Sequence, residues 1–197
     1  RLEIDLRALV SEAVRLQPVQ PSEDGRAAIW TYIMERLRGM YLEVDPSITT
    51  EMFDAVLATE PASPLDLDAR LQALKVFLAL PESASLASAN KRIANILRKS
   101  SAEASTDVSA ERLSDPAERK LFEHVIALER GVDPEFAQRN YERALSQLAA
   151  LKDDVDAFFD SVMVMHEDAG LRANRLSLLA KIRGLFLRGA DLSKLPG

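Results

Sequence analysis

The chain has 197 residues, of which 47% are hydrophobic and 28% are charged, and its formal net charge is −6 at pH 7. A chain of this length and composition can bury a hydrophobic core, which excludes a disordered protein. The acidic balance also excludes a protein that coats nucleic acid indiscriminately, because sequence-independent binding comes from basic side chains that meet phosphates. Any contact with nucleic acid must therefore be confined to a local patch.

The sequence contains no cysteine, so a disulfide, a thiolate metal site and a cysteine nucleophile are excluded. No apolar run approaches the ~20 residues that a membrane span needs. We therefore expect a cytoplasmic protein without a membrane partner. The chain opens on an amphipathic pattern without Met, and we expect it to be a piece of a longer protein.

Helix is the prediction for the whole chain, because glycines are few and apolar residues recur at three- and four-residue spacing. The predicted fold class is all-α, a helical bundle of about nine helices. In chain order we expect them at residues 3–17, 22–43, 46–59, 64–80, 83–99, 116–130, 134–150, 152–166 and 169–189. The apolar stripes in 6–14 and 29–41 are expected to face the core. The Ser- and Ala-rich stretch 100–109 is expected to be a mobile surface loop.

Four dipeptides mark helix starts by their chemistry. Each places a capping side chain before a Pro, which needs no amide partner in the first turn. They are Asp45-Pro46, Ser63-Pro64, Asp115-Pro116 and Asp133-Pro134. Glu118 adds the pattern of a capping box to Asp115.

A search for catalytic chemistry finds no catalytic residue and no metal site. Glycine-rich phosphate loops are absent from the sequence, and neither His124 nor His166 has a second ligand at helical spacing. The acidic run 152–160 is interpreted as a solvated helix face near a helix N-terminus. Asp160 is the exception, because its neighbours are apolar and its carboxylate needs a partner, for which an arginine of the following helix would suit.

Basic charge is concentrated in residues 83–102 and 170–190, which contain no acidic residue. Asn offers a donor and an acceptor to a base edge, while Arg and Lys offer the phosphate and stacking contacts that single-stranded RNA requires. The alternative is that these helices balance acidic neighbours through surface salt bridges worth ~0–1 kcal/mol each. Charge alone does not decide between the two.

Residues 158–193 resemble the C-terminus of the β subunit of bacterial glycyl-tRNA synthetase, with its pattern F-F-D-x-V-M-V-M-x-x-D…L-R-x-N-R-L…L-F-L-R-x-A-D-[IL]-S. Residues 89–97, Ala-Asn-Lys-Arg-Ile-Ala-Asn-Ile-Leu, resemble the family's A-N-K-R-[IV]-x-N-I-L. Residues 5–14 and 67–74 are also similar to this subunit. One departure is Gly189, where the family usually has Val; glycine there is expected to soften the end of the last helix by ~1 kcal/mol.

The resemblance implies a DALR-type anticodon-binding helical domain at 81–197, preceded by a helical segment at 1–80 that connects it to the body of the subunit. It implies binding of glycine tRNA, in support of glycine attachment during translation, within an α2β2 glycine–tRNA ligase. ATP and Mg would be used at the separate α subunit, so no cofactor is expected in this chain. DNA is not expected as a partner. The alternative is a purely structural or subunit-interaction module of the same synthetase.

The residues expected to contact RNA lie in the two basic segments. The first choice is Asn90, Lys91, Arg92, Asn95, Arg98 and Lys99, and the second is Arg172, Asn174 and Arg175. Two alternatives stay open: Arg92 is a buried structural residue, or Arg175 pairs with Asp160 instead of touching RNA.

Overall fold

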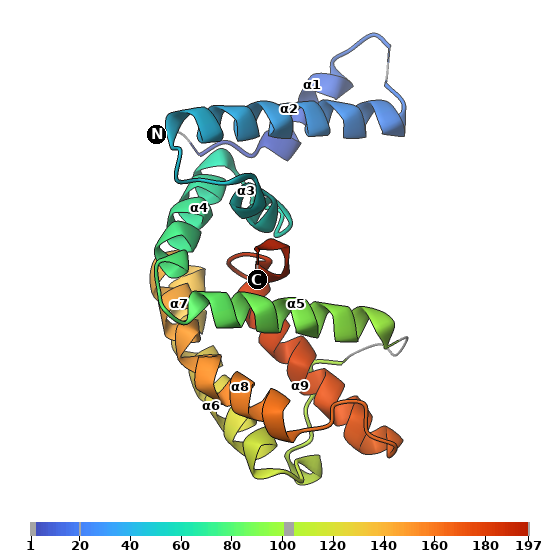
Figure 1. The fold of residues 1–197 in the computed structure, drawn as a ribbon. Coiled ribbons are helices and arrows are strands. Elements are labelled where there is room, and N and C mark those ends of the chain that lie inside the picture. Colours follow the sequence, from blue (N-terminus) through green and yellow to red (C-terminus); the bar gives the residue numbers. More distant parts are fainter. Residues whose placement is uncertain (1–2, 20, 101–104, 197) are drawn as a thin grey trace.

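A computed structural model describes residues 3–19, 21–100 and 105–196. Over these residues the chain forms nine α-helices and no β-strand, which confirms the all-α prediction (Figure 1). Two 3-10 turns, η1 (Ala110–Arg112) and η2 (Ala149–Leu151), lie between helices, and a third, η3 (Leu192–Lys194), follows the last one. The α-helices are α1 (Leu6–Arg15), α2 (Glu23–Val44), α3 (Thr50–Leu57), α4 (Pro64–Leu78), α5 (Ser83–Lys99), α6 (Pro116–Ala137), α7 (Tyr141–Leu148), α8 (Lys152–Ser161) and α9 (Ala169–Leu187).

Two of the four predicted helix starts are confirmed. Ser63 caps α4 by accepting from the Asp66 amide at 3.1 Å, and Pro64 is the first residue of the helix. Asp115 and Glu118 form the predicted capping box at the start of α6. These local signals work because each cap is completed within four residues of the chain.

The start predicted at Asp45-Pro46 is wrong. Asp45 ends α2, and its carboxylate accepts from the Ser47 amide at 3.0 Å and from Lys75 of α4 at 2.9 Å. The hydrogen bonds from Ser47 and Lys75 lower the pKa of Asp45 to about 2. Helix α3 begins later, and Thr49 is its cap.

The start predicted at Asp133-Pro134 is also wrong, because α6 continues through Pro134. Proline costs a helix one backbone hydrogen bond, and burial of Val132 and Phe136 on either side of it offsets that loss. The helix ends instead shortly before Arg139, whose φ is +60°. The Arg139 amide donates to the Phe136 carbonyl, and the next amide donates to the Glu135 carbonyl, as in a Schellman motif.

Helix α8 is shorter than predicted, since it ends at Ser161 and not at residue 166. Residues 162–165 alternate instead: Val162 and Val164 are buried, while Met163 and Met165 are exposed. Apolar residues at this spacing do not form one face of a helix, because a period of two is that of extended chain.

The hydrophobic core is one continuous cluster that extends from Ile48 to Leu195. Helix α4 packs on α7 and α5 packs on α8 and α9, while the C-terminal turn returns to α3, where the Asp191 amide donates to the Ala55 carbonyl at 2.8 Å. The core therefore crosses the boundary predicted at residues 80 and 81. That boundary stays a prediction about function and does not mark a break in packing.

Helices α1 and α2 lie together at one end of the molecule, apart from α5 to α9 (Figure 1). Trp30 joins them, with the Arg7 guanidinium 4.3 Å from its ring centre, and it faces the turn before α4. The prediction that both apolar stripes face the core is wrong in part, because Leu9 is 54% exposed and Met40 is 48% exposed.

Gly189 lies beyond the end of α9 in a buried position. A Cβ atom there would come within 2.9 Å of Cδ2 of Leu145, a fully buried residue of α7. Leu145 thus fills the space that a side chain at 189 would need. This packing explains how the chain accommodates glycine at position 189. Gly189 itself lies outside the last helix.

We expect Gly189→Val to lower the free energy of unfolding by about 1–3 kcal/mol, because it overpacks the contact with Leu145. Urea denaturation measures the loss. Combining it with Leu145→Ala should recover part of the stability that Leu145→Ala alone removes. Additive losses in the double variant would contradict this account of the site.

Candidate nucleic-acid interface

Helix α5 has a buried face and a basic face. Leu86, Asn90 and Ile93 lie on the buried face, and Asn90 is only 2% exposed. Its side-chain amide donates to the Leu86 carbonyl at 2.9 Å. The sequence predicts that Asn90 reads a base, but it is a core residue that cannot reach one in this structure.

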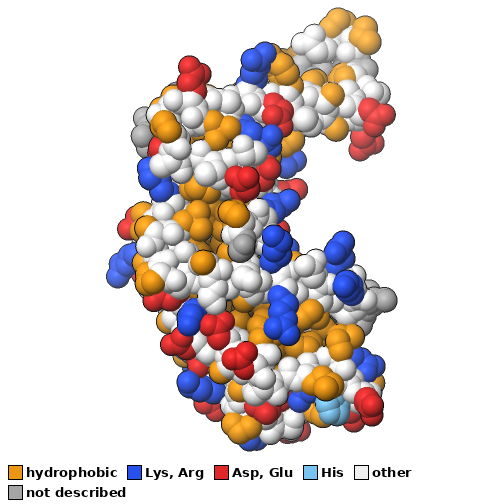
Figure 2. Space-filling model, viewed as in Figure 1, with side chains coloured by type: hydrophobic (Ala, Val, Ile, Leu, Met, Phe, Trp, Pro, Cys, Tyr) orange, Lys and Arg blue, Asp and Glu red, His pale blue; other side chains and the backbone are white. Residues whose placement is uncertain are grey.

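The other five α5 residues chosen from the sequence are exposed. Among the residues that the structure describes, none of the four cations has a carboxylate within ion-pair distance. Arg98 donates instead to the Asn95 side chain at 3.0 Å, and the Arg92 guanidinium lies 4.1 Å from the centre of the Phe159 ring. Figure 2 shows Lys and Arg side chains along this part of the surface. We call this set the α5 basic face; it comprises Lys91, Arg92, Asn95, Arg98 and Lys99.

Helix α9 is also basic in sequence, but its cations have partners within the same chain. Lys181 pairs with Glu129 at 2.8 Å, Arg183 with Asp191 at 3.0 Å and Arg188 with Asp133 at 2.5 Å. Arg172 donates to the carbonyls of residues 166 and 167, just before the helix. The salt-bridge alternative is therefore correct for α9.

Asn174 and Arg175, expected to contact RNA, are each only 6% exposed. The Asn174 side chain binds both backbone groups of Ser109, accepting from its amide at 2.8 Å and donating to its carbonyl at 3.0 Å. It thereby fixes the chain that leads into η1. The stretch 100–109 is predicted to be a mobile loop. Residues 101–104 lie outside the described residues. Ser109, at the end of the stretch, is held by Asn174.

Arg175 does not pair with Asp160, so that alternative is wrong. Its guanidinium binds Glu118 of α6, and it also donates to the Met163 carbonyl at 2.7 Å. Asp160 is exposed, whereas its apolar neighbour Phe158 is buried in the core. A carboxylate in water needs no partner, which removes the reason for the predicted pair.

Two grooves flank the α5 basic face. One, of about 430 Å³, lies toward the C-terminal turn and is lined by Asn95, Arg98, Arg183 and Ser193 among others. The other, of about 360 Å³, lies between α5 and α8 and contains Arg92, Phe159 and Asp160. Both are within the 300–1,000 Å³ typical of ligand sites.

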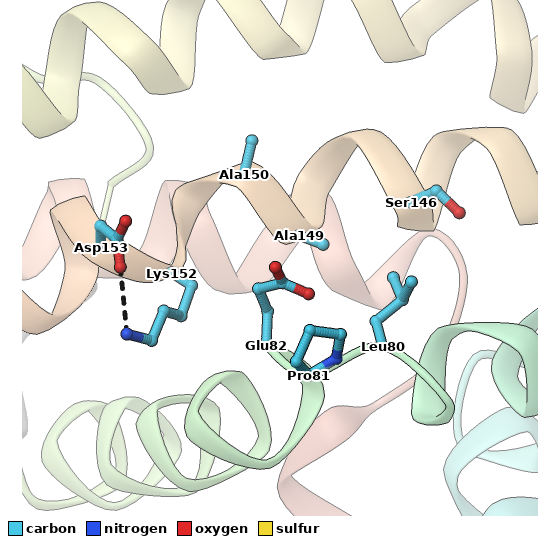
Figure 3. Close-up of a pocket in the computed structure, with 8 residues that line it drawn as sticks. All are labelled: Leu80, Pro81, Glu82, Ser146, Ala149, Ala150, Lys152 and Asp153. Atoms are coloured by element: carbon cyan, nitrogen blue, oxygen red, sulfur yellow. Dashed lines mark hydrogen bonds and ion pairs between the residues drawn. The ribbon is translucent and has the colours of Figure 1, made fainter.

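A third groove, of about 550 Å³, separates the α4–α5 turn from α7 and α8 (Figure 3). Its charged groups are Glu82, Lys152 and Asp153, and Lys152 is already bound to Asp153 at 3.0 Å. Its other lining groups are mostly small or apolar, so no set of free polar groups converges there.

No three His, Cys, Asp or Glu side chains in the described part of the chain are grouped so as to hold a metal ion. His124 binds the Asp154 carboxylate at 2.6 Å, which Lys120 also binds. Burial acts to raise the pKa of Asp154, and these two hydrogen bonds outweigh it and lower that pKa. None of the described helices is long and apolar enough to cross a membrane.

Comparisons with known proteins agree with this architecture. The β subunit of glycine–tRNA ligase from Sodalis glossinidius (strain morsitans) is 45% identical over 196 residues, which is 99% of this chain and 28% of that protein. Those from Ectopseudomonas mendocina (strain ymp) and Yersinia pestis (strain Pestoides F) are 43% and 44% identical over 195 residues, again 28% of their length. The chain thus spans just over a quarter of these relatives. Residues 86–195, which hold α5 to α9, match the DALR anticodon binding domain, and the chain belongs to this family.

Proposed function

We propose that this chain binds the anticodon region of glycine tRNA through the α5 basic face, as part of a glycyl-tRNA synthetase. The observation that carries the proposal is the contrast between the two basic helices. The cations of α9 are neutralised by acids or carbonyls of the same chain, whereas those of α5 point outward and have no carboxylate partner among the described residues. Unpaired surface cations on an acidic protein form the local patch that RNA phosphates require.

The α5 basic face also has the chemistry to bind a loop of single-stranded RNA. Lys91 and Lys99 provide point charges for phosphates, and Arg92 and Arg98 provide planar groups that stack on unpaired bases. Asn95 offers hydrogen bonds to a base edge. Asn90, Asn174 and Arg175 are buried, and Arg172 is bound to the carbonyls just before α9, so these four residues are not part of the proposed site.

The rest of the proposal rests on the names of the relatives and on what the resemblance to the β subunit implies. Glycine attachment would take place in an assembly with a separate α subunit, in an α2β2 arrangement, where ATP and Mg are used. No residue of this chain is assigned to that chemistry. The cytoplasm is the compartment in which such an assembly would work.

We expect Lys91→Glu/Arg98→Glu to weaken binding of glycine tRNA by at least about tenfold, which corresponds to about 1.4 kcal/mol. The slope of log affinity against log salt should fall by about one for each phosphate that the variant no longer binds. Gel shift measures the affinity, and thermal unfolding measures stability, which should not change.

A matched control is Arg26→Glu/Arg130→Glu, which changes the net charge equally at exposed positions on α2 and α6. It should retain tRNA affinity. The structural alternative predicts the reverse for the α5 variant, namely lower thermal stability with unchanged tRNA affinity. Equal losses in both variants would mean that charge in general, and not the α5 basic face, binds the RNA.

A further inference from the structure

The groove between α5 and α8 is the place where two stretches that carry the family resemblance meet. Residues 89 and 92 of the first stretch line one side, and Asp160 with Phe159 of the second lines the other. Arg92 and Asp160 are both exposed, and neither forms an ion pair with another described residue. The groove is lined by Ser85, Ser88, Ala89, Arg92, Asp156, Phe159 and Asp160.

The groove contains a flat cation, because the Arg92 side chain of α5 reaches a ring of α8 and rests on it. The Arg92 guanidinium lies 4.1 Å from the centre of the Phe159 ring. That ring packs edge-on against Phe158, which is fully buried, with 5.5 Å between ring centres. Arg92 is exposed, so its guanidinium has a surface that faces solvent. A guanidinium plane of this kind is a stacking platform for an unpaired base.

The α8 side of the groove also offers a free acceptor. Asp156 is occupied, since Ser85 donates to it at 2.9 Å and Lys152 lies 3.2 Å away. Asp160 is exposed, and no hydrogen bond or ion pair joins it to another described residue. A carboxylate accepts from amino and imino N–H groups but repels phosphate oxygens and carbonyls. This side therefore suits the edge of a base and not the RNA backbone.

We propose that this groove binds one nucleobase of the RNA loop, stacked on Arg92, and selects a base with an amino group by hydrogen bonding to Asp160. The inference rests on the proposed function, which brings the loop to α5. It adds a discrimination that the phosphate contacts of the α5 cations do not make, because cations bind phosphates without regard to sequence. Cytosine presents an amino donor at the position where uracil presents a carbonyl acceptor. The imino N–H of uracil lies between two carbonyls, which the carboxylate repels, so the site favours cytosine.

The test uses two RNA hairpins that carry the glycine anticodon loop, one unchanged and one with the anticodon cytosines replaced by uracils. The unaltered chain should bind the cytosine hairpin roughly tenfold or more tightly, as expected for one good base contact. Asp160→Asn should abolish this difference, because an amide both donates and accepts and so serves either base. Asp160 is exposed, so this substitution should leave folding intact.

A second variant separates stacking from selection. Arg92→Lys keeps the charge but removes the plane, so it should weaken binding of both hairpins while Asp160 preserves their ratio. Persistence of the cytosine preference in Asp160→Asn, or its absence from the unaltered chain, would overturn this inference and leave the proposed function standing. Failure of the unaltered chain to bind either hairpin would overturn both.

Discussion

We expect Arg175→Ala to lower the free energy of unfolding by about 3–5 kcal/mol, the cost typical of removing one partner of a buried ion pair. The side chains of Arg175 and Glu118 are 7% and 1% exposed. Without Arg175, one oxygen of Glu118 keeps its bonds to the amides of Ser114 and Asp115, and the other is left buried without a partner. Against a total stability of about 5–15 kcal/mol, this is a large loss, which urea denaturation measures.

A matched control on the same helix is Lys181→Ala, which removes a more exposed pair with Glu129 and should cost less than about 1 kcal/mol. Arg175→Met combined with Glu118→Gln should recover most of the loss, because no unpaired charge stays buried. If Arg175→Ala costs no more than the control and weakens tRNA binding, Arg175 belongs among the RNA-contacting residues after all.

The elements that can be predicted from the sequence are those completed by near neighbours. The predictions at Ser63-Pro64 and Asp115-Pro116 are correct because each cap closes on an amide two or three residues away. The same kind of dipeptide misleads at Asp45-Pro46 and Asp133-Pro134. At the first, Asp45 is bound by Lys75, 30 residues away, and at the second the burial of flanking apolar residues decides the outcome.

The candidate site shows the same limit. The exposed residues of α5 can be predicted because they are polar and cluster on one side of an amphipathic helix. The prediction for Asn90 is wrong, although the sequence does contain a signal of its burial. Asn90 lies four residues after Leu86 and three before Ile93, which is the spacing of one buried helix face. The Arg92 contact with Phe159 cannot be predicted, because helical periodicity does not say that α5 lies beside α8.

For three of the α9 cations, the partners come from too far along the chain to leave a local signal. Glu118, Glu129 and Asp133 of α6 lie 57, 52 and 55 residues before the cations that they bind. Two segments of similar basic composition therefore have different roles. Arg175, Lys181 and Arg188 join α9 to α6. The α5 cations face outward, where we propose that they meet RNA.

We expect Arg70→Ala to cost about 3–5 kcal/mol as well, because Arg70 joins three helices. It binds Asp66 of α4 at 3.0 Å, lies 4.4 Å from the ring centre of Tyr141 on α7, and donates to the carbonyl of Arg188, just past the end of α9, at 2.6 Å. Its loss leaves Asp66, which is 3% exposed, as a buried charge without a cation. Arg70→Lys should cost less, because it keeps the charge beside Asp66, yet it cannot also reach the end of α9.

The dependence of stability on pH distinguishes this network from simple packing. Burial alone would raise the pKa of Asp66, but bonds from Tyr141 and the Ala62 amide, with the charge of Arg70, lower it below its ordinary 3.8. Asp66 therefore stabilises the fold above that pH, and its contribution is lost as the pH falls further. Burial and the bond to Asp66 raise the pKa of Tyr141 to about 12, so its contribution is present below pH 10 and is lost as the pH rises toward 12.

Urea denaturation across this range should show the acid loss of stability beginning at higher pH in Arg70→Ala, since burial then acts on Asp66 with less opposition. Tyr141→Phe should reduce the loss above pH 10 and leave Arg70 in place. An Arg70→Ala variant that is destabilised equally at every pH would show that Arg70 acts through packing on Tyr141 and the end of α9, and not through the charge of Asp66.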